Sequence, residues 1–263
     1  MADKEKTDRD FEPKSDLTED SALALLSAPD VAPETCERLA KNGSLLMSRK
    51  VKVALVCHPR TPRHVSVPVA RQLYTFDLMK VALSPSVVSD IKVAIDDILI
   101  ARLKTLTVGE RLTLARRATG RVAAALLVES EPVSTKADAS NDDAALEYEK
   151  RDKKRKSNFS QKDARVMQTA LENPRLTEAL LIKAILSPRT GFALIDAVAR
   201  HVKWSKRREV RAALLRTEYL PLAKALEYSR EVPTDALLEL LGSSRLPEPL
   251  KILLIKGSKS YRS

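Results

Sequence analysis

The sequence predicts an all-α fold, and two observations carry that prediction. Glycine (6 of 263 residues) and aromatic residues (4%) are scarce, whereas alanine and leucine, which favour helices, are abundant. Proline, serine, threonine or aspartate repeatedly stands where an apolar stretch with helical periodicity begins. These are the residue types that start helices, so the chain reads as many helices joined by short turns.

Composition divides the chain into four segments. Residues 1–16 are mostly charged and predict a disordered acidic tail, and residues 131–163 predict a disordered charged insertion. We expect N-terminal helical repeats over residues 17–130 and C-terminal helical repeats over residues 164–263. The two sets are predicted to form one continuous solenoid across the insertion.

An approximate period predicts stacked helix pairs. When residues 131–163 are left out, Val51, Val93, Val166 and Val210 begin similar apolar stretches at intervals of 40 to 44 residues. Such intervals match a two-helix repeat, in which neighbouring hairpins bury a continuous apolar strip. The prediction is therefore a HEAT/armadillo-like helical-repeat solenoid, an α-α superhelix of roughly ten to twelve helices.

Two similar stretches predict successive turns. Asn173-Pro174 and Ser187-Pro188 are 14 residues apart, about one helix and its turn, and each precedes an apolar helix. Asn173 and Ser187 are suited to cap such turns. His58-Pro59 opens a third stretch of this kind, and we expect His58 to take the position of Asn173.

The stretches "ENPRLTEALLIKAI" and "HPRTPRHVSVPVARQLYTFDLMKVALSP" resemble leucine-rich repeat variant and HEAT-like solenoid proteins of bacteria. They resemble more closely an uncharacterised HEAT-like family of soil bacteria such as acidobacteria. The resemblance covers about residues 20–130 and 164–250 and implies an α-solenoid. The founding leucine-rich repeat variant protein carries a Cys-ligated iron–sulfur cluster, but this chain lacks such cysteines, so no cofactor is expected. In the family a short polar turn would replace the insertion at 131–163.

Charge is unevenly distributed along the chain, whose net charge is +11. Residues 1–30 carry net −5, residues 31–130 net +8, residues 131–163 net zero and residues 164–263 net +8. The predicted helical parts are therefore basic. A basic body suggests nucleic acid or another anionic partner, and solubility alone is the alternative.

The stretch "HVKWSKRREVRAALLR", residues 201–216, is the strongest candidate for a binding surface. Lys203, Arg207 and Arg211 are four residues apart and predict a helical stripe of cations that could follow phosphates. Trp204 could stack on a base. Alternatively, Trp204 packs between repeats and the cations form a solvated face. The candidate residues are Lys203, Trp204, Lys206, Arg207, Arg208 and Arg211.

Two further stretches have competing interpretations. Residues 149–156, "EKRDKKRK", are either a solvated linker or a flexible basic arm that strengthens contact with an anionic partner. The stretch "RQLYTFDLMKVAL" places Tyr74, Phe76, Leu78 and Met79 at spacings that suit either the core or a binding groove. Residues of these types at helical spacing favour the core.

No pattern of catalytic or metal-binding residues is apparent in the sequence. His58, His64 and His201 are not spaced as metal ligands, and no motif of a hydrolase, phosphate-binding loop or dinucleotide site occurs. Cys36 and Cys57 are expected to be core residues in a reducing cytoplasm. No signal region or apolar run of membrane-spanning length is present, so no membrane partner is expected.

These observations favour a non-enzymatic helical-repeat scaffold that mediates protein–protein interaction with a partner yet to be identified, in the cytoplasm. The alternative is a HEAT-like protein that binds nucleic acid through its basic face. A DNA glycosylase is a third hypothesis, but Trp204 lacks the carboxylate partner that such an enzyme needs. We therefore expect no catalytic, cofactor-binding or metal-binding residues.

Overall fold

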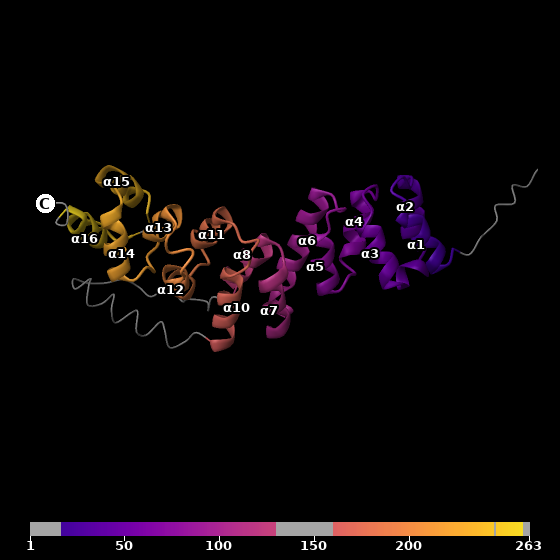
Figure 1. Ribbon diagram of the computed structural model, residues 1–263, viewed down its shortest axis with the longest axis horizontal. Helices are drawn as coiled ribbons and strands as arrows, with labels where there is room; N and C mark the ends of the chain where they lie inside the picture. Colours follow the sequence, from indigo (N-terminus) through magenta and orange to yellow (C-terminus); the bar gives the residue numbers. More distant parts are fainter. Residues whose placement is uncertain (1–16, 130–159, 245, 260–263) are drawn as a thin grey trace, which may run out of the picture.

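The computed structural model describes residues 17–129, 160–244 and 246–259, and every regular element in these ranges is helical. Fifteen α-helices and two short 3-10 helices follow one another along the described chain (Figure 1). The predicted all-α class is confirmed. The expected number of ten to twelve helices was too low, because the helices are short, with 8 to 14 residues.

The helices before residue 130 are α1 (Glu19–Ser27), α2 (Pro33–Lys41), α3 (Arg49–Cys57), α4 (Arg63–Ala70), α5 (Thr75–Leu83), α6 (Ser89–Arg102), α7 (Val108–Arg117) and α8 (Gly120–Glu129). The two 3-10 helices are η1 (Leu45–Met47) and η2 (Leu103–Thr105). The later helices are α10 (Gln161–Leu171), α11 (Glu178–Ile185), α12 (Phe192–Arg200), α13 (Arg208–Leu215), α14 (Leu222–Glu231), α15 (Thr234–Gly242) and α16 (Glu248–Lys259).

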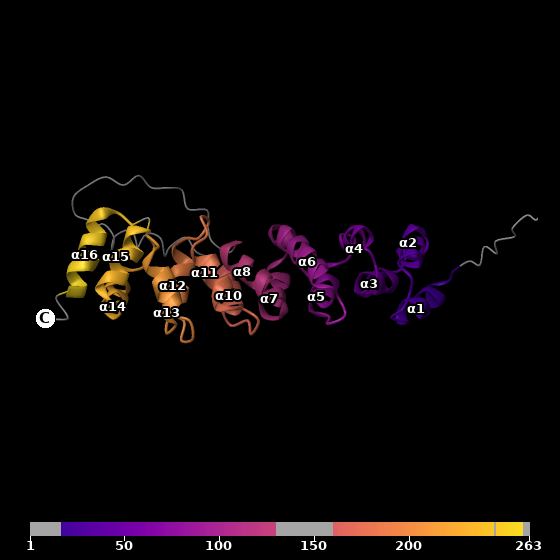
Figure 2. The same cartoon turned by 90° about the horizontal axis from the view of Figure 1, so that it is seen from above.

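The helices lie in chain order along an elongated molecule (Figures 1 and 2). Helices that follow each other pack together, as α3 and α4 do, and helices two places apart also make contact, as in α1 on α3 and α2 on α4. In the middle of the molecule, α7, α10 and α12 form one row and α8, α11 and α13 form the other. Most contacts therefore join helices that are neighbours, or next neighbours, in the order in which the described helices follow one another.

Helices two places apart in the chain begin closer together than the predicted period of 40 to 44 residues. The starts of α1 and α3 are 30 residues apart, as are those of α12 and α14. The predicted period was wrong because it joined Val51 of α3 to Val93 of α6, three helices further on and in the other row. Short amphipathic helices resemble one another, so a match between stretches does not distinguish equivalent from non-equivalent helices.

Helix starts follow the chemistry expected at N-termini. The hydroxyls of Ser48 and Thr177 accept hydrogen bonds from N–H groups in the first turns of α3 and α11. Thr107 and Glu110 form a reciprocal capping box at α7. Pro33 opens α2, where the absence of its N–H removes no helical bond. These groups satisfy donors that the helix itself leaves without partners.

Asn173 links the turn between α10 and α11 to the end of α7. Its side-chain oxygen accepts a hydrogen bond from the N–H of Arg175 at 2.8 Å. Its amide nitrogen donates to the carbonyls of Ala115 and Ala118, at 2.7 and 3.2 Å, where α7 ends. Because Asn173 is 1% exposed, all three bonds replace contacts with water that the buried groups have lost.

Histidines take this position in two other turns. His58 ends α3, and its Nδ1 accepts a hydrogen bond from the N–H of Arg60, while its Nε2 lies 3.0 Å from the carbonyl oxygen of Ala28. The expectation that His58 caps a turn as Asn173 does is confirmed. His201 occupies the turn after α12, and its Nδ1 accepts from the N–H of Lys203 at 3.2 Å.

Other buried side chains also donate to carbonyls near the ends of earlier helices. The indole N–H of Trp204 donates to the carbonyl of Leu171 at 2.9 Å, where α10 ends. The hydroxyl of Tyr228 in α14 donates to the carbonyl of Ala199 in α12. The last carbonyls of a helix lack intrahelical donors, so these bonds satisfy the helix ends and also join them to later parts of the chain.

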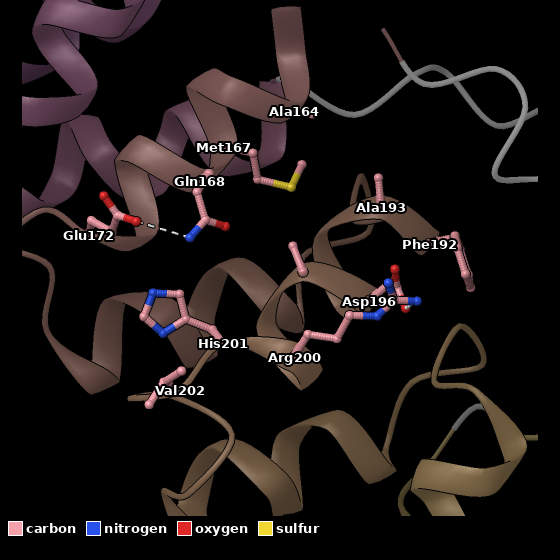
Figure 3. Close-up of a pocket in the computed structure, with 11 residues that line it drawn as sticks. Ala164, Met167, Gln168, Glu172, Phe192, Ala193, Asp196, Arg200, His201 and Val202 are labelled. Carbon is pink, nitrogen blue, oxygen red and sulfur yellow. Dashed lines mark hydrogen bonds and ion pairs between the residues drawn. The ribbon is translucent and has the colours of Figure 1, made fainter. Parts of the chain in front are cut away.

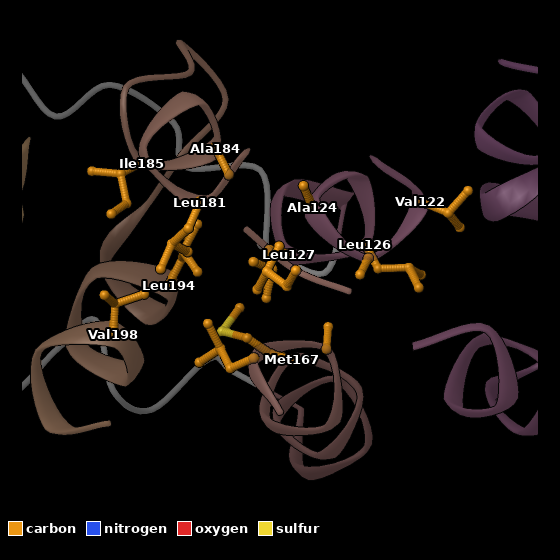
Figure 4. Packing of buried hydrophobic residues seen from close by; sticks show 14 of the residues in the cluster. Val122, Ala124, Leu126, Leu127, Met167, Leu181, Ala184, Ile185, Leu194 and Val198 are labelled. Atoms are coloured by element: carbon orange, nitrogen blue, oxygen red, sulfur yellow. The ribbon is translucent and has the colours of Figure 1, made fainter. Parts of the chain in front are cut away.

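The hydrophobic core is shared by the helices before residue 130 and the helices after residue 159. Leu127 of α8, Met167 of α10 and Leu181 of α11 belong to one buried cluster that extends from Val56 to Leu254 (Figure 4). A smaller cluster lies under α1 to α3. Each fully buried leucine contributes about 1.5–3 kcal/mol relative to exposure, so the strip between the rows stabilises the whole elongated fold.

Gly120 lets α8 approach the turn between α10 and α11. A Cβ atom at this position would overlap the backbone carbonyl of Arg175, and it would also lie 3.0 Å from a methyl group of Leu180. The absence of a side chain therefore permits the close packing that joins the helices on the two sides of the break.

Parts of the predicted organisation lie outside the described residues. These are the tail over residues 1–16, nearly all of the insertion, and the basic segment 149–156. One boundary is corrected: residues 161–163, assigned to the insertion, belong to α10, whose N-terminus is capped by the hydroxyl of Ser160. None of the described helices combines the length and apolar character needed to cross a membrane.

Candidate partner-binding surfaces

An open hollow of about 560 Å³ lies between α10 and α12 (Figure 3). Alanines of both helices face it, and their short side chains leave space that larger residues would fill. Buried Met167 and Phe192 add to the apolar floor. The volume is in the range of ligand pockets. The lining residues are Ala164, Met167, Gln168, Glu172, Phe192, Ala193, Asp196, Ala197, Arg200, His201 and Val202.

Polar groups of the hollow are paired with one another. The side-chain amide of Gln168 donates to the carboxylate of Glu172 at 3.0 Å, along α10 (Figure 3). Arg200 pairs with Asp196 one turn earlier in α12, at 2.8 Å. This arrangement suits binding, since an apolar group could occupy the floor while the rim remains solvated.

His201 forms the edge of the hollow and is held as a hydrogen-bond acceptor by the N–H of Lys203. Burial is the main cause that lowers the pKa of His201 below 6.5, the charge of Lys203 lowers it further, and the charge of Glu172 opposes the shift. The neutral imidazole is therefore favoured near neutral pH, and its Nδ1 is already occupied by a backbone donor.

The predicted stripe at residues 203–211 does not lie along one helix. Residues 202–206 form turns and α13 begins at Arg208, with Arg207 as its N-cap. The prediction of a continuous helical stripe was wrong, because a cap residue has extended backbone and breaks the four-residue spacing. Lys203, Lys206, Arg207 and Arg208 are nevertheless exposed, and they gather at the turn between α12 and α13.

Two candidate residues of the stripe have structural roles. Trp204 is 2% exposed and cannot present its ring to a base, although Lys203 lies over that ring at 4.1 Å. Arg211 donates to the carbonyl of Ser205 at 2.5 Å and pairs with Glu231. The alternative interpretation was that Trp204 packs between repeats, and the ring is indeed buried, with its N–H bonded to the end of α10.

A second basic cluster was missed by sequence reasoning. Arg116 and Arg117 at the end of α7 and Arg165 in the middle of α10 surround a hollow of about 330 Å³. Leu112, Thr113 and Thr169 complete its lining. The paired arginines in "LARRATGR" were the available signal. Arg165 is 48 residues further along the chain, so only the packing of α10 on α7 brings the three together.

The histidines and cysteines have structural contacts. The thiol of Cys36 lies 3.7 Å from Nδ1 of His58, but Cys36 is fully buried and His58 is 6% exposed. Cys57 is partly buried, and burial raises the pKa of its thiol. His64 pairs with Glu37 at 3.2 Å. Within the described ranges, no group of three or more His, Cys, Asp or Glu side chains is placed to hold a metal ion.

The stretch that suggested a second groove is divided between core and surface. Leu78 and Met79 are buried, whereas Tyr74 is 71% exposed and Phe76 is 38% exposed. Tyr74 lies beneath the guanidinium of Arg49, at 5.8 Å from the ring centre. The core interpretation therefore describes Leu78 and Met79, and the two aromatic residues lie at the surface.

No family model, curated protein or solved structure matches the chain.

Proposed function

We propose that the chain is a non-enzymatic helical-repeat scaffold of the HEAT or armadillo kind, with a role in protein–protein interaction. Two rows of helices with contacts mainly between neighbours support a solenoid of this kind. The resemblance of "ENPRLTEALLIKAI" to bacterial HEAT-like proteins agrees with it. A cytoplasmic location is part of the proposal and is supported by the free thiols of Cys36 and Cys57.

The observation that carries the proposal is the hollow between α10 and α12. Its apolar floor can accept one large apolar side chain of an extended or helical partner segment, and burial of such a side chain contributes about 1.5–3 kcal/mol. Exposed Val202 extends the apolar surface at one edge. The carboxylates and the guanidinium at the rim are paired within the chain, which favours binding over acid–base chemistry.

Filling the hollow provides a direct test. Ala197→Phe places a ring into it from α12, and Ala179→Phe makes the same change at an exposed position of α11 as a control. Peptides would be selected from a random twelve-residue display library on the unchanged protein. We expect peptides with an apolar anchor that bind the unchanged protein and the Ala179→Phe variant, and that lose at least tenfold in affinity for Ala197→Phe.

The circular-dichroism melting curves of the two variants would show that the fold is kept. Peptides that bind all three proteins equally would place the interaction elsewhere and contradict the proposed site. Failure to select any peptide against the hollow would contradict the proposal as well.

A further inference from the structure

We propose that Arg116, Arg117 and Arg165 form a binding site for the phosphodiester backbone of nucleic acid. The three exposed guanidiniums line one hollow of about 330 Å³ between α7 and α10. Guanidinium groups bind phosphate oxygens through paired hydrogen bonds, which makes arginine the residue best suited to this ligand. This proposal concerns a different surface from the peptide-binding hollow and does not depend on it.

The hollow contains cationic donors that have no counter-ion among the described residues. The hydroxyls of Thr113 and Thr169 donate to carbonyls of their own helices, so the guanidiniums are its remaining donors. Among the described residues, no carboxylate forms an ion pair with the three arginines. The neighbouring Arg111, by contrast, pairs with Asp163 at 3.2 Å. An anion bound between the arginines would relieve the repulsion between them.

Helix stability alone does not explain the cluster. Arg116 and Arg117 lie in the last turn of α7, where cations interact favourably with the helix dipole. Arg165 lies in the fifth position of α10 and gains little from that effect. It nevertheless faces the same hollow. The convergence of cations from two helices therefore points to a ligand rather than to local stabilisation.

Further cationic side chains lie on the two turns that follow along the same edge. Arg175, in the turn after α10, donates from its guanidinium to the carbonyl of Arg117 at 3.2 Å. The bond between Trp204 and Leu171 then sets the turn after α12 beside the end of α10. That next turn carries the exposed cations of residues 203–208. Three successive turns therefore present positive charge along one edge of the molecule.

An extended row of cations distinguishes between anionic partners. Packed helices are about 8–10 Å apart, so the edge offers charge at repeated intervals. A nucleic acid carries a regular series of phosphates and can engage several turns at once. A single phosphorylated side chain would use only the hollow. The observed row therefore favours a nucleic acid backbone over an isolated phosphate group.

The test measures fluorescence anisotropy of labelled 20-mer duplex DNA and single-stranded RNA at several salt concentrations. We expect log affinity to fall with log salt, with a slope near −0.9 for each phosphate engaged in duplex and about −0.7 in a single strand. Arg165→Gln should weaken binding about three- to tenfold near 150 mM salt and reduce the slope by about 1. The stronger of the two probes identifies the preferred nucleic acid.

Arg189→Gln is the matched control, because it removes the same charge from an exposed position in the turn between α11 and α12, at the opposite helix ends. It should retain nearly full affinity, and the triple substitution of Arg116, Arg117 and Arg165 by Gln should abolish salt-resistant binding. Inorganic phosphate and a poly-glutamate peptide of equal charge serve as competitors and should displace the nucleic acid poorly.

Three results would overturn the proposal. Equal losses of nucleic acid affinity in Arg165→Gln and Arg189→Gln would show that binding depends only on the overall charge of the protein. If poly-glutamate displaced the labelled nucleic acid as well as unlabelled nucleic acid does, the partner of this edge would be an acidic protein. Absence of nucleic acid binding at 150 mM salt would show that the three arginines do not form such a site. Ala197→Phe should leave nucleic acid affinity unchanged, so failure of the scaffold proposal and failure of this one are separable.

Discussion

Trp204 donates its indole N–H to the backbone carbonyl of Leu171, 2.9 Å away, and this bond joins the turn after α12 to the end of α10. The ring is 2% exposed. The same tryptophan suggested base stacking when only the sequence was considered, because it stands among cations. Its buried position against the end of α10 assigns it to stability and leaves the surrounding lysines and arginines at the surface.

Trp204→Phe should therefore reduce stability. The substitution leaves the carbonyl of Leu171 without its donor and removes part of the buried ring, at a cost of about 1–3 kcal/mol. Urea denaturation followed by circular dichroism measures the loss. Val202→Ala, at a 76% exposed position, should change stability by less than about 0.5 kcal/mol. A Trp204→Phe variant as stable as the unchanged protein would contradict this assignment.

Features set by local sequence could be predicted, as the turns illustrate. Asn173-Pro174 and Ser187-Pro188 mark two consecutive turns, and His58 takes the position of Asn173. Proline fixes its own backbone, and a short polar side chain can bond the backbone two residues on, so both signals act over a few residues. The all-α class follows from composition in the same way.

Features set by tertiary packing could not be predicted. The period of 40 to 44 residues failed because residues such as Val51 and Val93 look alike although their helices lie in different rows. The prediction of a helical stripe was wrong because Arg207 is the N-cap of α13 and does not lie within the helix. The cluster that joins Arg117 to Arg165 depends on contact between α7 and α10, for which the sequence gives no local signal.

Gly120→Ala should destabilise the junction between α8 and the turn after α10. The added Cβ would overlap the carbonyl of Arg175, and backbone cannot move aside as a side chain can. Overpacking of this kind costs about 1–3 kcal/mol. Gly109→Ala is the control, because a Cβ there meets nothing within 4 Å in α7, and alanine in a helix is favoured by about 0.5–1 kcal/mol. Thermal denaturation should shift in opposite directions, and equal shifts would contradict the packing argument.

His201→Asn should make the stability of the fold less sensitive to a fall in pH below neutral. Burial lowers the pKa of His201 in the folded state below the ordinary 6.5. The imidazole therefore binds a proton more readily in the unfolded chain than in the folded one. As a result, the contribution of His201 to the free energy of unfolding is complete above pH 6.5 and is lost as pH falls through the lowered pKa. Protonation also removes the acceptor used by the N–H of Lys203. Asparagine accepts such a bond without titrating, as Asn173 does.

The melting temperature between pH 5 and 8 checks this expectation. The curve of His201→Asn should be flatter than that of the unchanged protein over the acid half of this range, with little difference at pH 8. His201→Ala removes the titration and the acceptor together, so it should be less stable than His201→Asn at pH 8. Parallel curves for His201→Asn and the unchanged protein would exclude a contribution of this imidazole.

Asn173→Ala should be the most destabilising single change in the turns. It removes one bond to the N–H of Arg175 and two bonds to carbonyls of α7 in a fully buried site, and the loss should be about 3 kcal/mol. Ser187→Ala removes a longer bond of 3.4 Å in the less buried next turn and should cost about 0.5–1 kcal/mol. Urea denaturation compares the two directly.

Asn173→Asp separates hydrogen bonding from shape, since the two side chains have nearly equal volume. The carboxylate keeps an acceptor for Arg175, but it places an oxygen against the carbonyls of Ala115 and Ala118, where the amide of Asn173 donated. Burial of that charge is costly, so Asn173→Asp should be at least as destabilising as Asn173→Ala at pH 7. The deficit should shrink at pH 4 to 5, where protonation restores a donor. An aspartate variant as stable as the unchanged protein at pH 7 would mean that the turn opens to water and that Asn173 does not join this turn to the end of α7.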